Sequence, residues 1–249
     1  MTRKEKTYCK EVVRLGRHLK RLAIPKHWPL PRKVGKWAPK PRAGPHSIER
    51  SLPLLVIVRD LLGYSDKSNE VKKIIHERNI MVDGRVCRDP KLPVGLMDVL
   101  EIKNTGEKFR VLIDKRGELF LNPIEENESH FKLCRVEDKR IIKGERHQLN
   151  LHDGRNHIVE DKNIKVGDVL SLKVPSQEII DVLKFDVGAL ALIIGGSHRG
   201  KIGIINQINV LRRVQPNTVI LTVNGTKIQT IKEFVFVVGK DEPVISLGR

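Results

Sequence analysis

The spacing of apolar residues divides the chain into a first segment with helical periodicity and a long remainder dominated by β periodicity. In residues 3–22 the apolar positions recur at intervals of four and three, which predicts one face of a helix. These positions are Tyr8, Val12, Leu15, Leu19 and Leu22. Because this apolar face is narrow, the helix is expected to fold against another surface.

Residues 25–45 contain six prolines, at positions 25, 29, 31, 39, 41 and 45. Proline fixes φ and removes an amide donor, so this segment is expected to be an extended, polyproline-like strap outside any core. Trp28 and Trp37 lie in the strap among lysines and arginines. Aromatic rings interleaved with cations suit base stacking or cation–π contact, and docking onto the next domain of the protein is an equal alternative.

A small folded module is expected to begin near residue 46, where the composition changes from basic and proline-rich to apolar. Helical spacing predicts one helix over residues 52–62 and a second over residues 69–78, with Ser68 as its cap. The Asp83-Gly84 pair between apolar residues predicts a tight hairpin.

From residue 108 onward the pattern changes to short alternating runs separated by turn residues, which is typical of small β-barrels or a sandwich. Residues 175–181 are the expected joint between two units. The strands are predicted at residues 109–113, 118–121, 169–174, 190–194, 202–205, 219–223 and 234–238.

Positive charge is concentrated at the start of the chain. Lys and Arg outnumber Asp and Glu by 47 to 30, and the net charge is +17. Residues 1–42 hold 14 cations and two acids, so this segment carries 14 − 2 = +12 and the rest of the chain +5. A polyanion is therefore the expected partner, either nucleic acid or an anionic membrane surface. We interpret residues 1–42 as a basic, largely unfolded arm that contacts phosphate backbone.

Other compositional features narrow the functional classes. No apolar run approaches the roughly 20 residues of a membrane span, and no signal peptide is recognisable, so a soluble, intracellular protein without membrane contact is expected. Cys9, Cys87 and Cys134 are far apart and are interpreted as structural thiols. Because no histidines and cysteines have zinc-ligand spacing, we expect no metal.

Residues 195–201 fit the Gly-x-x-x-x-Gly-Lys pattern of phosphate-binding loops in nucleotide hydrolases. Ile202 stands where a Ser or Thr would bind magnesium, and a strand pattern follows where a helix would be needed. We therefore interpret these residues as a turn between strands that presents His198, Arg199 and Lys201 to an external anion. With no nucleophile–base pattern either, the sequence does not predict an enzyme, a cofactor or a small-molecule substrate.

Two segments resemble known RNA-associated modules. Residues 186–206, with their glycine-rich turn between apolar runs, resemble the KOW motif, a small barrel of ribosomal proteins and transcription factors. Residues 51–102 resemble the RNA-binding module named after bacterial small-subunit protein four, with Ile80-Met-Val-Asp-Gly-Arg-Val86 matching its strand and turn. Asn69 replaces the arginine usual at the start of its second helix. The expected phosphate contacts in this module are Lys72, Lys73, Arg78, Arg85 and Arg88.

The order of the motifs is more specific than any one of them. The chain resembles, over essentially its whole length, the archaeal and eukaryotic type of small-ribosomal-subunit protein four. The resemblance lies in the order and spacing of segments 18–28, 37–46, 93–99 and 152–155 and of the KOW turn that follows them. The length of this chain favours the archaeal type. The resemblance implies a structural component of the small subunit in the cytoplasm, with small-subunit rRNA and neighbouring ribosomal proteins as partners.

The resulting fold prediction is an α+β protein. It comprises a basic extension (1–45), a two-helix-plus-hairpin RNA-binding module (46–104), a central β domain (105–177) and a KOW-type small barrel with C-terminal strands (178–249). The arm is expected to neutralise phosphates while the modules recognise RNA shape. The arm residues expected to contact RNA are Arg14, Arg17, His18, Lys20, Arg21, Lys26, His27, Trp28, Arg32, Lys33, Lys36, Trp37, Lys40 and Arg42.

Two other functions fit parts of the sequence. A KOW-type transcription or ribosome-assembly factor would bind RNA transiently, and the long basic arm favours a permanent assembly instead. An RNA-modifying enzyme could carry the helix–hairpin module, but residues 105–249 contain only short strands without a recognisable catalytic set.

Overall fold

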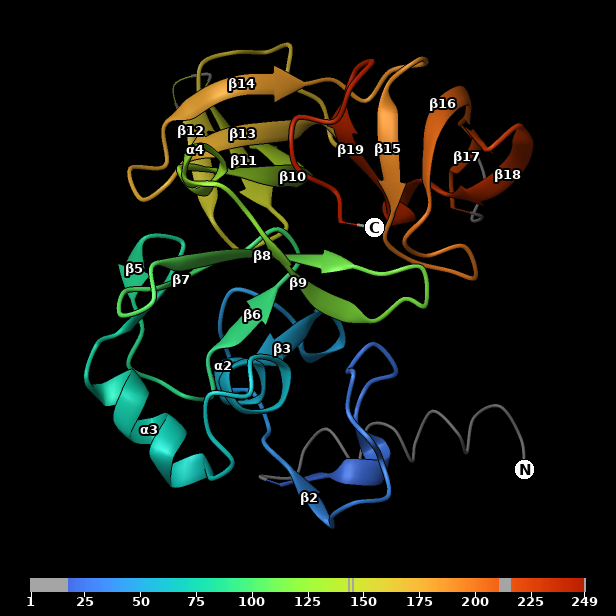
Figure 1. The fold of residues 1–249 in the computed structure, drawn as a ribbon. Helices are drawn as coiled ribbons and strands as arrows, with labels where there is room; N and C mark the ends of the chain where they lie inside the picture. The colour runs from blue at the N-terminus through green and yellow to red at the C-terminus, as the bar shows by residue number, and fades with distance from the viewer. Residues whose placement is uncertain (1–17, 143, 145, 211–215, 249) are drawn as a thin grey trace.

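The structure, a computed structural model, describes residues 18–142, 144, 146–210 and 216–248 (Figure 1). Short strands predominate over helices, as the sequence predicts, and they form barrel-like antiparallel sheets. Three five-stranded sheets follow one another along the described chain, and we call them the N-terminal, central and C-terminal sheets.

The N-terminal sheet carries the arm and most of the described helices. Its strand order is β5-β4-β7-β8-β9, and two smaller pairs, β1-β2 and β3-β6, lie beside it. The strands are β1 (Leu19–Lys20), β2 (Trp37–Ala38), β3 (Ser51–Pro53), β4 (Ile80–Val82), β5 (Arg85–Val86), β6 (Pro93–Gly95), β7 (Val99–Ile102), β8 (Glu107–Ile113) and β9 (Leu119–Pro123). The helices are η1 (Arg21–Ala23), η2 (Ile48–Arg50), α2 (Leu54–Val56), the π-helical η3 (Ile57–Leu61) and α3 (Ser68–His76).

The central and C-terminal sheets have the orders β12-β11-β10-β13-β14 and β18-β17-β16-β15-β19. The central elements are α4 (Glu126–Ser129), β10 (Phe131–Ile141), β11 (His147–Leu151), β12 (Asn156–Val159), β13 (Val169–Lys173) and β14 (Ile179–Leu183). The C-terminal elements are β15 (Leu190–Ile193), β16 (Ile202–Asn209), β17 (Thr218–Val223), β18 (Thr226–Ile231), η4 (Lys232–Phe234) and β19 (Val235–Gly239). All seven predicted strands overlap strands of the structure.

The predicted helices and hairpin of the N-terminal module are present with shifted boundaries. The first helix begins at Leu54, because residues 51–53 pair with β6 as a strand. Ser68 lies inside α3 and does not cap it; its hydroxyl accepts a hydrogen bond from Arg59 at 3.0 Å. Asp83 and Gly84 have φ values of 50° and 68°, the left-handed pair that a type I′ hairpin turn requires.

The prediction that the strap lies outside any core is wrong. Ile24, Trp28 and Leu30 are buried in the same apolar cluster as α2 and α3 of the module. The Trp28 indole, only 2% exposed, donates a hydrogen bond to the Ser51 carbonyl at 2.9 Å. The prolines do keep the chain irregular, but the apolar residues between them bury enough surface to fix residues 18–42 on the module. The arm is therefore folded along its described length.

The helix predicted over residues 3–22 is replaced, in its described part, by β1 and the start of η1. Residues 19 and 20 pair with residues 38 and 37, so backbone pairing across the strap takes the place of helical bonds. Residues 3–17 of the predicted helix lie outside the described residues.

The sheets continue across two of the expected domain boundaries. Strands β8 and β9 extend the N-terminal sheet beyond residue 104 to Pro123. Residues 174–178 form the turn of the β13–β14 hairpin, where Lys173 donates its amide proton to the Glu178 carbonyl at 2.8 Å, so they are not a joint between units. The proline there lies in a turn between paired strands, which the sequence pattern does not distinguish from a linker.

A buried lysine joins the N-terminal and central sheets. Lys132, on β10, is fully buried, and its ammonium group donates hydrogen bonds to the carboxylates of Asp83 (2.9 Å), Asp98 and Asp153 (3.1 Å). Asp83 lies in the β4–β5 turn, Asp98 in the β6–β7 turn, and Asp153 in the turn after β11. Arg155 adds a second cation, 2.6 Å from Asp83. Three turns of two sheets therefore meet at one ammonium group.

Mutual attraction outweighs desolvation in this cluster. Burial by itself raises the pKa of Asp98. The charges of His46 and Lys132 together have a larger, opposite effect, so the pKa of Asp98 lies well below its ordinary value. Burial likewise opposes the charged form of Lys132, whereas the neighbouring carboxylates hold its pKa well above the ordinary value. For Asp153 the same balance gives a pKa of about 2. All three groups are thus charged near neutral pH.

Two buried arginines make further connections between sheets. Arg110, on β8, donates to the carbonyls of Glu128 (2.6 Å) and Phe131 (2.9 Å) at the entry to β10. Arg135, on β10, donates to the Glu233 carbonyl at 2.7 Å, immediately before β19. Leu96, Leu112 and Leu133 pack in one apolar cluster with residues of the C-terminal sheet. The three sheets therefore share buried contacts rather than meeting through exposed linkers.

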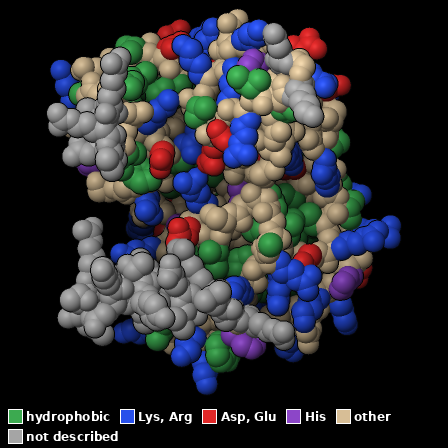
Figure 2. All heavy atoms as spheres, turned by 180° about the vertical axis from the view of Figure 1, so that it is seen from behind, with side chains coloured by type: hydrophobic (Ala, Val, Ile, Leu, Met, Phe, Trp, Pro, Cys, Tyr) green, Lys and Arg blue, Asp and Glu red, His purple; other side chains and the backbone are tan. Residues whose placement is uncertain are grey.

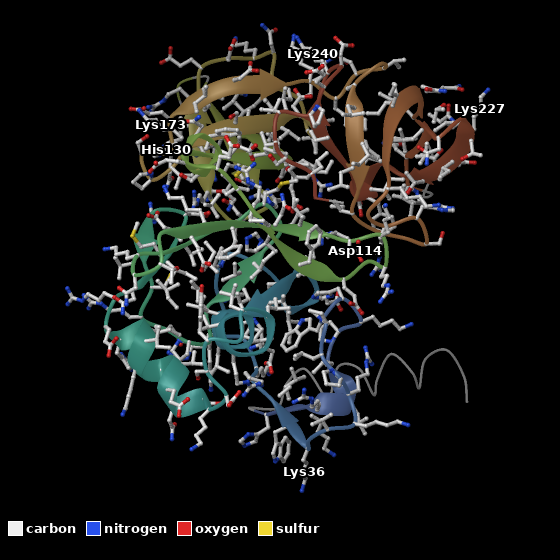
Figure 3. All side chains as sticks on the ribbon, viewed as in Figure 1. Lys36, Asp114, His130, Lys173, Lys227 and Lys240 are labelled. Carbon is white, nitrogen blue, oxygen red and sulfur yellow. The ribbon has the colours of Figure 1, made fainter. Side chains whose placement is uncertain are left out.

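We expect Lys132→Met to destabilise the protein by about 3–5 kcal/mol, because three buried carboxylates would lose their central cation. Urea unfolding followed by circular dichroism at pH 7 measures the change. Lys173→Met, at an exposed lysine one strand away (Figure 3), is the matched control and should change stability by less than about 0.5 kcal/mol. Equal effects in the two variants would contradict the role of the cluster.

Two histidines, the buried His27 and the partly buried His152, are held neutral by the fold. Burial lowers the pKa of His27 to about 4, and burial together with the charges of Lys132 and His46 lowers that of His152 to about 3. In the unfolded chain both take up a proton below about pH 6.5. The unfolded state therefore binds more protons in this range, and acid favours it.

The free energy of unfolding is expected to fall as the pH drops from about 6.5 to 4, by at most about 1.4 kcal/mol per pH unit for each of these histidines. It should fall faster below about pH 3.8, where the unfolded chain also protonates Asp98 and Asp153. His27→Gln should flatten the first part of the curve, since glutamine can donate to the Ser51 carbonyl without titrating. Urea titrations at each pH test this, with exposed His130→Gln as control. A His27→Gln curve as steep as that of the unmodified protein would contradict it.

Candidate nucleic-acid interface

Cationic side chains are spread over the face of the molecule that Figure 2 shows. Of the predicted contacts in the arm, Lys20, Lys26, Lys33 and Lys36 are exposed, whereas Arg21, Arg32 and Lys40 are partly buried. Arg14 and Arg17 lie outside the described residues. The arm therefore presents lysines from a segment that the apolar cluster holds in place.

Two of the predicted arm arginines have partners within the protein. Arg42 pairs with Asp89 at 2.9 Å, although its side chain remains largely exposed. Arg21 donates from Nε to the Pro31 carbonyl at 2.6 Å, which closes the loop between η1 and the strap. In this structure both arginines stabilise the conformation of the arm.

The two tryptophans of the strap have different environments. Trp28 is buried, and His27 beside it donates a hydrogen bond from Nε2 to the same Ser51 carbonyl at 3.3 Å. Docking on the protein is therefore the correct alternative for Trp28. Because His27 is also buried, with its pKa lowered to about 4, it offers neither surface nor charge to a phosphate at neutral pH.

Trp37 remains on the surface, half exposed, at the end of the β1–β2 pair. The His18 ring lies with its centroid 5.4 Å from the Trp37 ring, tilted by 49°. The Lys36 ammonium group lies 5.4 Å from the Trp37 centroid, within cation–π range. An exposed aromatic face flanked by a cation is the arrangement on which unpaired bases stack.

The five cations predicted in the helix–hairpin module are all exposed. Helix α3 buries Val71 and Ile75, which directs Lys72 and Lys73 to the opposite side, and Arg78 follows in a left-handed conformation. Arg85 and Arg88 lie instead on and after strand β5. The structure thus separates these five cations into a helix group and a hairpin group.

The glycine-rich turn between β15 and β16 packs against other parts of the protein. A Cβ at Gly195 would collide with the Phe234 ring, and one at Gly117 would lie 2.9 Å from Cδ of Arg199. Arg199 is therefore partly buried against the β8–β9 turn, and of the three predicted residues only Lys201 is exposed. His198 is partly buried, 3.4 Å from the Lys201 ammonium group.

Two cations that the sequence reasoning missed lie next to this turn. Lys115 and Arg116, in the β8–β9 turn, are exposed. The Asp-Lys-Arg-Gly sequence at 114–117 is a turn signal with two adjacent cations, so this pair could have been noticed. Nothing in the sequence indicates that it meets residues 198–201, which follow more than 80 positions later.

The described residues contain no group of three or more His, Cys, Asp or Glu side chains able to hold a metal ion. Among the helices that the structure describes, none is long and apolar enough to cross a membrane. Burial raises the pKa of the Cys87 thiol to about 11, so this cysteine remains protonated at neutral pH. The arrangement of exposed cations and one exposed aromatic pair suits binding of an extended polyanion.

Comparisons with known proteins give the same family in every part of the chain that they cover. The model of the ribosomal family S4e matches residues 105–179, and the RS4NT domain model matches residues 16–49. The small ribosomal subunit protein eS4 of Methanothermobacter thermautotrophicus is 50% identical over 232 residues, covering 93% of this chain and 96% of the relative. That of Aeropyrum pernix is 44% identical over 247 residues, covering 95% and 98%.

A solved structure supports the same assignment. The crystal structure of the 30S ribosomal protein S4e from Thermoplasma acidophilum matches with a TM-score of 0.68 and 38% sequence identity, covering 77% of this chain and 96% of that one. Identity at this level over most of the length of several relatives shows common descent in sequence as well as in fold. The chain therefore belongs to the S4e family of ribosomal proteins.

Proposed function

We propose that this protein is a structural component of the small ribosomal subunit in the cytoplasm and binds small-subunit rRNA through phosphate-backbone and shape contacts. The proposal is supported by the relatives named small ribosomal subunit protein eS4. The observation that carries the RNA contact is the set of exposed arm lysines, which the buried Ile24–Trp28–Leu30 segment fixes on the folded module.

The binding mechanism follows from the charge and rigidity of this surface. Lysines that meet phosphates release condensed counterions, which gives affinity without reading sequence. Because the backbone of residues 18–42 is already folded, RNA binding has to order only the exposed side chains of this segment and not the chain that carries them. The helix group at Lys72 and Lys73 lies on the same module and would meet a second part of the RNA.

Trp37 would supply a contact of a different kind. Sequence-tolerant stacking on an aromatic face needs an unpaired base, and such bases occur in the loops and bulges of rRNA. His18 and Lys36 border the Trp37 ring and fix its orientation. We infer that one unpaired nucleotide stacks on this ring while the arm lysines hold the adjoining backbone.

Trp37→Ala should weaken binding to deproteinised small-subunit rRNA roughly five- to hundredfold, because stacking on an aromatic side chain contributes about 1–3 kcal/mol per base. Filter binding at fixed salt measures the change. Trp37→Phe should retain most of the affinity. Val34→Ala, which shortens another exposed apolar side chain of the strap, is the control. Full affinity in Trp37→Ala would rule out the stacking role.

The cellular assignment is tested by sedimentation. Native extract is separated on a sucrose gradient at low magnesium, which dissociates the subunits, and the protein is quantified by mass spectrometry in each fraction before and after a high-salt wash. A structural component should remain in the small-subunit peak in a 1:1 ratio with other small-subunit proteins. A transient assembly or transcription factor would appear in lighter fractions or leave on washing, and that outcome would overturn the proposal.

A further inference from the structure

Three segments that are far apart in the sequence meet on one side of the molecule. They are residues 26–27 of the arm, the β8–β9 turn at residues 114–118 and the β15–β16 turn at residues 194–201. Figure 1 shows the β8–β9 hairpin pointing toward the β15–β16 loop, and Figure 3 places Asp114 at this point. We call these segments together the three-turn junction.

The two hairpin turns interlock through glycine. Gly200 has φ of 73°, and a Cβ there would collide with the Asp114 carbonyl oxygen and lie 2.7 Å from the Lys115 amide nitrogen. Gly117 in turn leaves the space that the Arg199 side chain occupies. Each turn therefore carries a glycine where the other turn approaches most closely, and their relative position is fixed by backbone contact.

The arm is attached to the same place. The Leu119 amide donates a hydrogen bond to the His27 carbonyl at 2.9 Å, immediately after the β8–β9 turn. The charge of Arg199 also contributes to the lowered pKa of His27, after the larger effect of burial. Lys26 is the exposed neighbour of His27, so its side chain originates beside the two turns.

The junction carries a strong excess of positive charge. Lys26, Lys115, Arg116 and Lys201 are exposed, and Arg199 is partly buried with its Nε lacking a hydrogen-bond partner among the described residues. The side chains of Lys26, Lys115 and Arg116 make no hydrogen bond or ion pair with any other described residue. The acids in these segments are Asp114 and Glu118, so five cations stand against two acids, a net charge of 5 − 2 = +3.

We infer that the three-turn junction is a binding site for the phosphate backbone of one continuous rRNA stretch, which lies across the N-terminal module and the C-terminal sheet together. This inference rests on the proposed function. Because the two hairpin turns interlock and the arm is bonded beside them, the backbone that carries the four exposed cations is already ordered, and binding has to order only their side chains. Arginine adds a planar fork that matches phosphate oxygens in pairs.

The composition of the junction favours RNA over an acidic protein. Protein interfaces have an apolar or aromatic centre. None of the large apolar side chains that are exposed in the described structure lies in residues 26–27, 114–118 or 194–201. A surface of cations without an apolar centre suits the regularly charged backbone of a nucleic acid.

The double variant Lys115→Gln/Arg116→Gln tests this site. Binding of the full chain to deproteinised small-subunit rRNA is measured at several salt concentrations. If each side chain meets one phosphate, the slope of log affinity against log salt should become shallower by about 1.4–1.8, at roughly 0.7–0.9 per phosphate. Thermal unfolding should be unchanged, since both side chains are exposed. Lys227→Gln/Lys240→Gln removes the same charge from exposed positions of the C-terminal sheet region (Figure 3) and should leave the slope nearly unchanged.

A second measurement does not depend on substitution. Chemical modification of lysine and arginine, read by mass spectrometry, should show Lys115 and Arg116 protected when rRNA is bound and reactive when it is absent, while Lys227 reacts equally in both states. If the unmodified protein fails to bind rRNA, the proposed function fails. If it binds, but the junction variant keeps the full salt slope or Lys115 and Arg116 stay reactive, the junction inference alone is overturned. Normal rRNA binding with impaired assembly into subunits would indicate a protein partner and would also overturn it.

Discussion

The ammonium group of Lys132 determines how the N-terminal and central sheets lie against each other. It receives carboxylates from the β4–β5 turn, the β6–β7 turn and the turn after β11, so a displacement of any of these loops would take a carboxylate away from a buried cation. His46, which follows the arm, belongs to the same cluster, because its Nε2 donates to Asp98 at 3.0 Å. The start of the N-terminal module, its β4–β5 hairpin and the central sheet are thereby held by one set of charges.

The buried charges of the protein largely balance one another. Asp83, Asp98 and Asp153 are buried, but so are Lys132, Arg110 and Arg135. Arg110 donates to backbone carbonyls, and Arg135 donates to the Glu233 carbonyl and also pairs with Glu137 at 3.1 Å. The positive surface therefore comes from the local composition of the arm and of the three-turn junction, where cations outnumber acids, and this favours a polyanionic ligand.

Local signals in the sequence predicted local structure well. The Asp83-Gly84 turn, helix α3 and the apolar strands of the C-terminal sheet depend on residues a few positions apart, and each is present. Strand β10 was missed because Lys132 and Arg135 interrupt its apolar pattern, and only the folded protein supplies their partners. Trp28 and Trp37 look alike in the sequence, but contact with Ser51, a residue outside the strap, buries one and not the other.

Glycine explains why the candidate interface could be only partly predicted. The turn at residues 195–201 was recognisable as a phosphate-type turn, but its glycines do not open it to a ligand; Gly195 receives Phe234, and Gly200 receives the backbone at Asp114. The same small residues that suggested a free anion-binding loop instead fix it against a second basic turn. A cationic surface assembled in this way requires both parts of the chain to be folded, so its charge density is a property of the tertiary structure and not of either motif.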